Sequence, residues 1–416
     1  MPGPAADPCF DHQPTMLSVE EAVAALLSGA RPLTDQERIP LMRAAGRVLA
    51  GDLYSLLDVP GFDNSAMDGY ALHSRDLERA QSEGLPIAQR IPAGSPGSEL
   101  QPGTAARIFT GAPVPTGADT VVMQEFCRIE GERVILEQTV ATGANIRPRG
   151  NDIKRGSTVL AAGTLLQAAH LGLAASVGLG EVAVYRRPGV AIFSTGDELV
   201  EPGQPLAPGQ IYNSNRYQLS ALLEAQGCEV IDLGSIADDY ETTRRTLLAA
   251  AEQADLVVTT GGVSVGEEDH IKAALQAVGE LNLWRIRMKP GKPLAFGRIG
   301  AVPFIGLPGN PVSTYVTFLL FARPFIQHMQ GRTQTTPASW PVRAGFDYQS
   351  KQRREYVRVH LNHGPDGAPV AETYPRQGSD VLSSVVWADG LVEIPEATRI
   401  SSGDTVRFLP FSEWAR

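Results

Sequence analysis

The sequence predicts a multidomain protein of the α/β plus β class, with one doubly wound α/β unit, a split helical unit and two β-rich units. Its 416 residues exceed what one hydrophobic core supports, so roughly two to four domains are expected. Apparent strands and helices alternate between about 187 and 331, whereas short β-like runs occupy parts of the chain on both sides. The content of 43% hydrophobic and 20% charged residues is typical of folded globular proteins.

Two helices are expected near the N-terminus, because two capping boxes occur there. SVEE at 18–21 and TDQE at 34–37 each place a Ser or Thr three residues before a Glu. A further helical pattern, QAAHLGLAASVG, follows GSTVLAAGTLL much later in the chain. We therefore assign 1–53 and 153–186 to one discontinuous helical linker unit.

The intervening residues, 54–152, are expected to form an inserted β-rich unit. RIFTGAPVP, TVVMQEFCRI and ERVILEQTV are short β-like runs separated by Gly and Pro, and Glu130-Gly131 has the pattern of a hairpin turn. Upstream, DVPGFDNSAMDGYAL is dense in Asp, Asn, Ser and Gly but bracketed by apolar residues. This favours an ordered loop that presents the carboxylates of Asp63 and Asp68.

Residues 187–331 have the pattern of a parallel, doubly wound sheet. VAIFST, CEVIDLG and DLVVTT read as strands, and helical patterns lie between and after them. The apolar stretch at 312–326 is too short to span a bilayer and contains Arg323 and Pro324, so a buried helix is expected. Residues 332–416 carry β-like runs without a long helical pattern, which favours a small terminal β unit.

Acidic side chains follow the strands of this predicted sheet. Asp197 and Glu198 follow the first strand, Asp238 and Asp239 follow the second, and TTGGVSVGEED ends the third. Ligands of such sheets bind at the carboxyl ends of the strands. Each acid alone is better explained as an N-cap or a solvated loop residue. Together they favour a site, because gathered carboxylates need Mg²⁺ or basic side chains to compensate their charge.

Groups suited to an anion are expected at the same edge. VVTTGGVSVGEEDH at 257–270 has the order strand, Gly turn and helix start. This order predicts a phosphate-binding loop in which Gly261, Gly262 and Ser264 face the phosphate. A plain βα turn without a ligand has a similar pattern. The trailing Glu267 and Glu268 favour a helix N-terminus.

Two further loops carry candidate binding groups. Lys289 and Lys292 flank a Pro-Gly turn, and two lysines on one short loop suit a diphosphate, although turn lysines are often merely solvated. In GLPGNPVS, Asn310 suits an N-cap, Pro311 suits the first helical position, and Ser313 adds a donor. A second helix N-terminus is therefore expected at this edge.

Charge and composition argue against several classes of protein. The net charge of −10 is unsuited to an extended nucleic-acid surface. The N-terminal stretch MPGPAADPCFDHQP lacks a signal-peptide pattern, so a cytoplasmic protein without a membrane span is expected. Cys9, Cys127 and Cys228 are scattered, and neither a disulfide framework nor a thiolate metal site is expected.

The order and spacing of six motifs resemble those of the molybdopterin molybdenumtransferase family, which is related to the C-terminal domain of gephyrin. The motifs are DVPGFDNSAMDGYA, RIFTGAPVP, FSTGDEL, TTGGVSVGE, KPGKP and GLPGNPVS, and the likeness extends from about residue 16 to the end. The resemblance implies a lid-like inserted domain at 54–152, a molybdopterin-binding domain at 187–331 and a β-barrel at 332–416. It also implies a homodimer whose sites form between the α/β domain of one subunit and the inserted domain of the other.

The reaction that the resemblance implies uses adenylated molybdopterin and molybdate, inserts the metal at the dithiolene, and releases AMP with the help of Mg²⁺. A molybdopterin adenylyltransferase is the implied pathway partner. The implied catalytic positions are Asp68, Thr110, Glu198, Asp238, Asp269 and Lys289. Of these, Glu198, Asp238 and Asp269 would hold Mg²⁺. The implied binding positions are Arg285, Pro308, Pro311 and Ser379. Arg285 stands where the family has lysine, which keeps the charge but alters the geometry. YPRQGSD around Ser379 departs from the family's Gly-His-Gln-Gly type.

This chemistry agrees with the residues present. Sulfur ligands hold molybdenum in the cofactor, and the scattered cysteines cannot supply them, so the ligand must bring its own thiolates. Catalysis would then consist mostly of positioning and charge stabilisation. Two other functions remain open at this level: a molybdopterin adenylyltransferase, which would need neither DNSAMDGYA nor the β units, and a non-catalytic gephyrin-like scaffold. Molybdate and tungstate are not distinguished.

Overall fold

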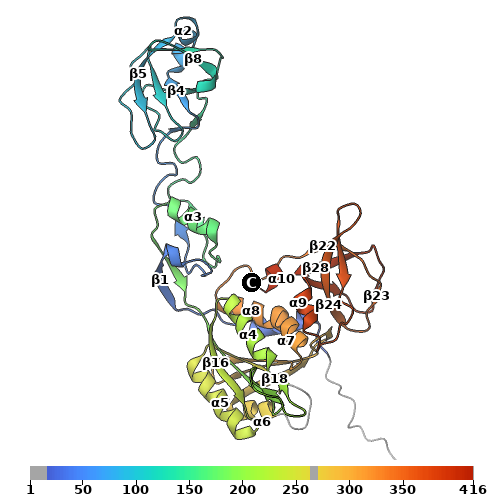
Figure 1. Cartoon of the computed structure of the whole chain (residues 1–416). Helices are drawn as coiled ribbons and strands as arrows, with labels where there is room; N and C mark the ends of the chain where they lie inside the picture. Colours follow the sequence, from blue (N-terminus) through green and yellow to red (C-terminus); the bar gives the residue numbers. More distant parts are fainter. Residues whose placement is uncertain (1–15, 263–269, 416) are drawn as a thin grey trace, which may run out of the picture.

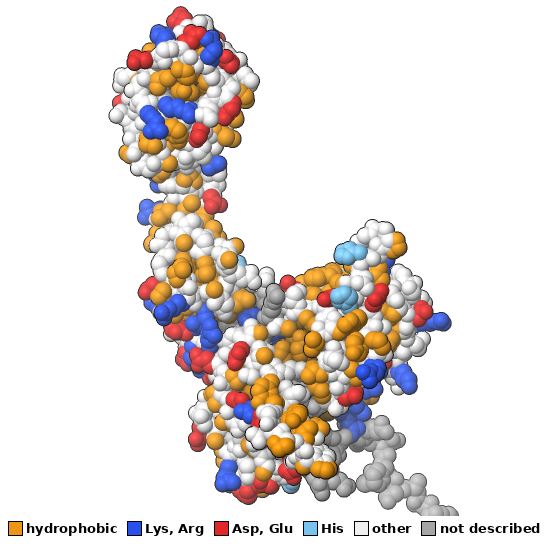
Figure 2. Space-filling model, viewed as in Figure 1, with side chains coloured by type: hydrophobic (Ala, Val, Ile, Leu, Met, Phe, Trp, Pro, Cys, Tyr) orange, Lys and Arg blue, Asp and Glu red, His pale blue; other side chains and the backbone are white. Residues whose placement is uncertain are grey.

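The computed structural model describes residues 16–262 and 270–415, and the chain is elongated (Figure 1). The inserted β-rich unit lies at one end, and a narrow linker connects it to the α/β unit, beside which the C-terminal β unit packs. Figure 2 shows open space between the inserted unit and the C-terminal unit. Within the described residues, no helix is both long and apolar enough to cross a membrane.

The first helix begins where the sequence predicts it. Helix α1 (Val19–Ser28) has Ser18 as its N-cap, and the backbone N–H of Glu21 donates to Ser18 Oγ over 3.1 Å. In return, the backbone N–H of Ser18 donates to the Glu21 carboxylate over 2.7 Å, which completes the capping box. The buried side chains of α1 pack into the same core as the α/β sheet.

The second predicted N-terminal helix is wrong, because strand β1 (Gln36–Pro40) occupies that position. This strand pairs antiparallel with β12 (Glu181–Tyr185), so the pairing of two distant segments overrides a local helix-start signal. The other elements here are η1 (Leu41–Arg43), β2 (Leu53–Tyr54), β11 (Thr158–Leu160) and α3 (Ala168–Ser176). Helix α3 confirms the later helical pattern, and the two chain segments share one small core.

The inserted unit contains a six-stranded sheet of order β7-β4-β6-β5-β9-β8. Its strands are β4 (Gly69–Leu72), β5 (Leu85–Ile91), β6 (Ala105–Ile108), β7 (Thr120–Met123), β8 (Cys127–Glu130) and β9 (Arg133–Leu136). The short elements are β3 (Asn64–Ser65), η2 (Ser74–Asp76), α2 (Leu77–Ser82), η3 (Gln124–Phe126) and β10 (Ile146–Arg147). The hairpin predicted at Glu130-Gly131 is confirmed, since β8 and β9 pair directly across it.

The α/β unit is a six-stranded sheet of order β16-β13-β17-β21-β20-β18 with helices on both faces. Side chains of β13 alternate between two cores: Val190 and Ile192 face one, Ala191 and Phe193 the other. The strands of the sheet are β13 (Gly189–Thr195), β16 (Glu229–Ile236), β17 (Leu256–Thr260), β18 (Gly279–Arg285), β20 (Pro293–Ile299) and β21 (Val302–Leu307). The short strands β14 (Leu199–Val200) and β15 (Ile211–Tyr212) pair with each other, and β19 (Met288–Lys289) pairs with a strand of the C-terminal unit. The helices of the α/β unit are α4 (Ser214–Ala225), α5 (Tyr240–Gln253), α6 (His270–Val278), α7 (Pro311–Thr317), the π-helical η4 (Phe318–Ala322) and α8 (Arg323–Met329).

The predicted doubly wound sheet is confirmed, but only four of its strands pair in parallel, and β20 runs opposite to the other five. β16, β13, β17 and β21 run parallel, whereas β20 and β18 are antiparallel to their neighbours. The connection from β20 to β21 pairs Ile299 with Val302, which is too short for a crossover and forces a hairpin. As a result, the loop between β18 and β20 lies at the carboxyl edge of the parallel strands.

The C-terminal unit is a closed five-stranded barrel. Its order is β24-β25-β22-β28-β26, and β26 pairs back with β24. The elements are β22 (Trp340–Ala344), β23 (Tyr348–Gln349), β24 (Arg354–His363), β25 (Pro369–Thr373), α9 (Ser383–Trp387), β26 (Gly390–Ile394), β27 (Arg399–Ile400), β28 (Thr405–Pro410) and α10 (Phe411–Trp414). The buried helix predicted at 312–326 is confirmed as α7, η4 and the start of α8.

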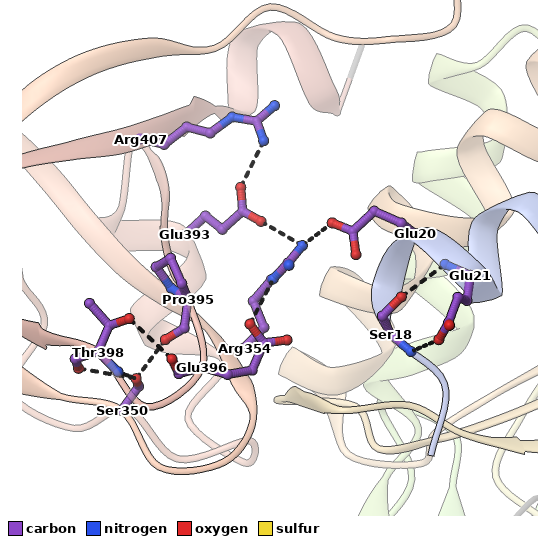
Figure 3. A network of polar contacts seen from close by, with 10 residues as sticks. All are labelled: Ser18, Glu20, Glu21, Ser350, Arg354, Glu393, Pro395, Glu396, Thr398 and Arg407. Atoms are coloured by element: carbon purple, nitrogen blue, oxygen red, sulfur yellow. Dashed lines mark hydrogen bonds and ion pairs between the residues drawn. The ribbon is translucent and has the colours of Figure 1, made fainter. Parts of the chain in front are cut away.

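An ion-pair network joins the barrel to α1 (Figure 3). Arg354 at the start of β24 pairs with Glu20 of α1, and its Nη1 lies 3.0 Å from Glu393 of the barrel. Glu393 also pairs with Arg407 over 2.9 Å. The barrel is thus held against the α/β core by charge pairs as well as by apolar packing.

One ion pair at the base of the α/β sheet makes stability depend on pH. Arg186 donates two hydrogen bonds of 2.6 Å to the two oxygens of Asp255, which also accepts from the backbone N–H of Gly189 over 2.8 Å. Burial acts to raise the pKa of Asp255, but these hydrogen bonds outweigh it and hold the pKa below the usual aspartate value.

We expect Asp255→Asn to lower the free energy of unfolding by about 2 kcal/mol at neutral pH. Because the folded pKa is depressed, the difference from wild type is fully present above pH ~4 and shrinks as the pH falls through the folded pKa. Urea unfolding at pH 7, 4 and 3 measures this. Asp35→Asn is the matched control, since Asp35 also contacts Arg186 but its side chain is 69% exposed. A constant difference at all three pH values would contradict the prediction.

Candidate functional site

A cavity of about 800 Å³ opens at the carboxyl ends of β13, β17 and β21. The chain passes from β13 outward to β16 and then returns to β17 on the other side, so the sheet reverses its winding direction here. Doubly wound sheets bind their ligands at such a point. The predicted residues that line the cavity are Glu198, Gly261, Gly262, Lys289, Lys292, Pro308, Asn310, Ser313 and Ser379.

The predicted Gly turn follows β17 and forms the floor between two strands. Gly261 has φ +86° and Gly262 has φ +60°, a backbone region that favours glycine. A Cβ at Gly262 would lie 2.5 Å from Cδ1 of Ile271 in α6. The backbone N–H of Gly261 donates to the carbonyl of Leu307 over 3.2 Å. The turn therefore needs both glycines to pack against β21 and α6.

The start of α7 forms the next wall. Asn310 is the N-cap and Pro311 lies in the first turn, as the sequence predicts. The Asn310 side chain, however, makes no capping bond; it donates through Nδ2 to Ser379 Oγ of the barrel over 3.0 Å. The backbone N–H of Val312 also donates to the carbonyl of Ser379 over 3.0 Å. A loop of the barrel thus caps this helix and closes the cavity from one side.

Cationic side chains surround the cavity. Lys289, Lys292 and Arg353 line it, together with the carboxylates of Glu198 and Asp380. Cations on short loops beside backbone N–H groups at a helix start form a site suited to phosphate or another oxyanion. The cavity volume is within the usual range for small-molecule sites.

The predicted acids separate into two kinds of position. Glu198 lines the cavity, whereas Asp238 follows β16 at the outer edge of the sheet. The two loops are linked, because the backbone N–H of Asp238 donates to Oδ1 of Asp197 over 3.4 Å. Asp239 is the N-cap of α5, and its side chain accepts from the backbone N–H of Thr242 over 2.9 Å. For Asp239, the alternative that these acids are N-caps is therefore confirmed.

Besides Asp238, two predicted residues of the α/β unit lie outside the cavity lining, and two more lie outside the described residues. Arg285 ends β18 and Pro311 lies in the first turn of α7, but neither lines the cavity. Ser264 and Asp269 fall in the stretch 263–269, outside the described residues.

Asp68 and Thr110 form a separate site on the inserted unit. Oδ1 of Asp68 accepts from the backbone N–H of Thr110 over 2.7 Å and from its hydroxyl over 2.8 Å. These hydrogen bonds, and more weakly the charge of Arg107, hold the pKa of Asp68 below its usual value. Thr110 is exposed and Asp68 is half-buried, and the linker separates their unit from the cavity of the same chain (Figure 1).

The structure adds lining residues that the sequence reasoning missed. Thr195 and Thr260 end two strands inside motifs already singled out, so the predicted strand ends contained a signal for them. Arg353, Gln377 and Asp380 come from barrel loops. Gln377 and Asp380 flank the predicted Ser379 in YPRQGSD, so that motif contained a signal for them, whereas the sequence around Arg353 gives no sign that this residue reaches the sheet edge.

Comparisons with known proteins agree along the whole described chain. Residues 17–178 match the family described as the MoeA N-terminal region (domain I and II), 191–328 match a probable molybdopterin binding domain, and 341–411 match the MoeA C-terminal region (domain IV). A molybdopterin molybdenumtransferase of Haemophilus influenzae is 41% identical over 402 residues, covering 95% of this chain and 99% of the relative. One of Nostoc sp. is 42% identical over 388 residues, covering 90% and 88%. The molybdopterin biosynthesis moeA protein of Pyrococcus horikoshii has a similar structure, with a TM-score of 0.82 and 30% identity over 95% of this chain and 99% of its own.

Proposed function

Because this chain belongs to the molybdopterin molybdenumtransferase family, we propose that it transfers molybdenum from molybdate to adenylated molybdopterin and releases AMP. The observation that carries the proposal is the cavity where the Gly turn after β17, the loop with Lys289 and Lys292, and the start of α7 meet. A ligand with a phosphoanhydride and a second oxyanion matches the backbone donors and cations of this cavity.

The cysteines support a ligand that brings its own thiolates. Neither Cys127 nor Cys228 lines the cavity. Burial raises the pKa of Cys127 to about 11 and that of Cys228 to about 12, so both stay protonated near neutral pH. The soft sulfur ligands that molybdenum needs therefore belong to the pterin dithiolene, and the protein holds the two reactants together.

The acidic residues fit a magnesium ion shared with the substrate. No cluster of three His, Cys, Asp or Glu side chains suited to a metal occurs within residues 16–262 and 270–415. Mg²⁺ commonly uses only one or two carboxylates and completes its shell with water and substrate phosphate oxygens. Glu198 and Asp238 would be those carboxylates, with Asp269 as a further candidate. When bound, the ion would neutralise charge at the phosphoanhydride.

The cationic residues would supply the remaining stabilisation. Lys289, Lys292 and Arg353 would hold the phosphate and the molybdate oxyanion, while the backbone of Gly261 and Gly262 would let the ligand approach closely. These groups act by position and charge, and none of them needs to form a covalent bond with the substrate.

The pair of Asp68 and Thr110 supports a homodimer. The pair lies on the inserted unit, which Figure 2 shows well separated from the α/β and C-terminal units of its own chain. We therefore propose that it completes the cavity of a second copy. Mixing inactive Asp68→Ala and Asp238→Ala variants under conditions of subunit exchange should restore up to about a quarter of the wild-type activity, since half the dimers then carry one intact site. A mixture that stays inactive despite exchange would count against completion by the partner.

The direct test is incubation of the purified protein with adenylated molybdopterin, molybdate and Mg²⁺, following AMP release and cofactor formation together. Both products should appear in equal amounts. A molybdopterin adenylyltransferase in the cytoplasm would supply the substrate. Binding of adenylated molybdopterin without AMP release would instead favour a scaffold, and ATP consumption with free molybdopterin would favour an adenylyltransferase.

A further inference from the structure

The loop that carries Lys289 is part of a sheet shared with the C-terminal barrel. Its two-residue strand β19 pairs in parallel with the start of β24, so that Met288 lies opposite Arg354 and Lys289 lies opposite Glu355. The backbone N–H of Arg354 also donates to the carbonyl of Arg287 over 2.9 Å. The position of this loop therefore depends on the barrel.

Glu355 joins Lys289 to the interior of the barrel unit. One carboxylate oxygen, Oε2, accepts from Lys289 Nζ over 2.9 Å and from the hydroxyl of Tyr348 over 2.7 Å. The Glu355 side chain is only 7% exposed, whereas that of Lys289 is 43% exposed and lines the cavity. Burial acts to raise the pKa of Glu355, but the hydrogen bonds from Tyr348 and Lys289 outweigh it, so the carboxylate stays ionised.

This contact fixes a side chain that would otherwise be mobile. An ammonium carries three N–H donors, and the bond to Glu355 uses one of them, which leaves two for an anion in the cavity. Lys292 on the same loop is exposed and makes no ion pair with any residue of the described ranges. The two lysines therefore differ: the barrel orients Lys289, whereas the long stem of Lys292 keeps its rotamer freedom.

We propose that Glu355, supported by Tyr348, is a positioning residue that holds the Lys289 ammonium where the anionic substrate binds. Through this contact the barrel takes part in substrate recognition. The inference rests on the proposed function, because it concerns the same cavity and the same oxyanion or phosphate ligand. It assigns to the barrel a role in preparing the site before the ligand arrives.

A neighbouring ion pair provides the matched control. Arg354, next to Glu355 on β24, pairs with Glu20 of α1 (Figure 3) and so also joins the barrel to the α/β core. Glu20 does not line the cavity. Glu20→Gln and Glu355→Gln are the same chemical change at two contacts between the same units, but only the second reaches Lys289.

The experiment measures kcat/KM for AMP release from adenylated molybdopterin with saturating molybdate and Mg²⁺. Glu355→Gln should lower it by about 10- to 100-fold, because loss of an orienting charge displaces the ammonium. Tyr348→Phe keeps the carboxylate and should lower it by about 3- to 10-fold through loss of one hydrogen bond to a charged group. Glu20→Gln should stay within about twofold of wild type.

A double-mutant cycle separates positioning from a general structural role. In a Lys289→Ala background, Glu355→Gln should have no further effect on kcat/KM, because it acts only through the lysine. An equal loss with and without Lys289, or wild-type kinetics of Glu355→Gln, would overturn the inference. If Glu355→Gln does not fold, the same cycle is run with Tyr348→Phe and decides in the same way. A wild-type protein that releases no AMP contradicts the proposed function itself, whatever the variants do.

Discussion

Replacement of Asp238 by alanine should lower the rate of AMP release by at least about 100-fold and leave the free energy of unfolding almost unchanged. The large effect is expected because, in the proposed mechanism, the Asp238 carboxylate would hold Mg²⁺ at the phosphoanhydride, and a bound metal ion can supply several kcal/mol of charge stabilisation in the transition state. The small effect on stability is expected because Asp238 lies at the outer edge of the sheet, where its backbone N–H, retained in alanine, donates to Asp197. AMP release and urea unfolding measure the two quantities.

The adjacent residue gives the control. Asp239 is the N-cap of α5, so Asp239→Ala should lower the free energy of unfolding by about 1 kcal/mol. Its rate of AMP release should remain near wild type, since its carboxylate is used by the N–H of Thr242. The assignment would be wrong if Asp238→Ala turned over normally, or if the two variants lost activity to the same degree. Titration of Mg²⁺ provides a second measurement, because only Asp238→Ala should need a higher concentration.

The second large effect is expected at Arg358, whose side chain is 1% exposed. Its guanidinium donates to Ser384 Oγ over 3.0 Å and to the carbonyl of Gly378 over 2.9 Å, and its backbone is bonded to the Gln377 side chain in both directions. Burial lowers the pKa of Arg358 to about 10, so it stays charged at neutral pH. The arginine thus holds the loop of Gln377, Gly378 and Ser379 that lines the cavity.

Arg358→Lys should lower the free energy of unfolding by about 2–4 kcal/mol and AMP release by about 100-fold. Lysine keeps the charge but lacks the planar fork, so buried partners are left without hydrogen bonds and the cavity loop shifts. Arg323→Lys is the control, because Arg323 is also buried and donates to the carbonyls of Thr335 and Glu413, far from the cavity lining. It should lose stability but retain activity. Equal activity losses in both variants would show that general destabilisation, rather than the loop, is responsible.

Patterns within short stretches predicted most of the fold. The alternation after 187 was sufficient for a doubly wound sheet, because buried strands and amphipathic helices have different periods and occur in turn. The helix predicted from the capping-box pattern at 34–37 is wrong. The pattern is present in the sequence, but the backbone from Gln36 onward pairs with β12 instead of forming a helix. Patterns within short stretches also missed the antiparallel edge of the sheet, which depends on a two-residue turn between β20 and β21.

The candidate site was predictable in its loops but not in its walls. The turn with Gly261 and Gly262 and the loop with Lys289 both follow strands of one sheet. Because ligands of such sheets bind at the carboxyl ends of the strands, the sequence alone indicates that these two segments lie at one site. Arg353, Glu355 and Arg358 belong to another unit, and their part in the site comes from long-range docking that no local pattern encodes.

The pairing of β19 with β24 determines when, during synthesis of the chain, the cavity becomes complete. Lys289 and Glu355 are 66 positions apart, which a ribosome adds in about 3–13 s at typical rates of translation. The α/β unit can therefore fold while its lysine still lacks the carboxylate that orients it. A nascent or prematurely terminated chain would possess the glycine turn but an unfinished cavity, so we expect the cavity to bind its anionic ligand only after the barrel strand with Glu355 has been synthesised.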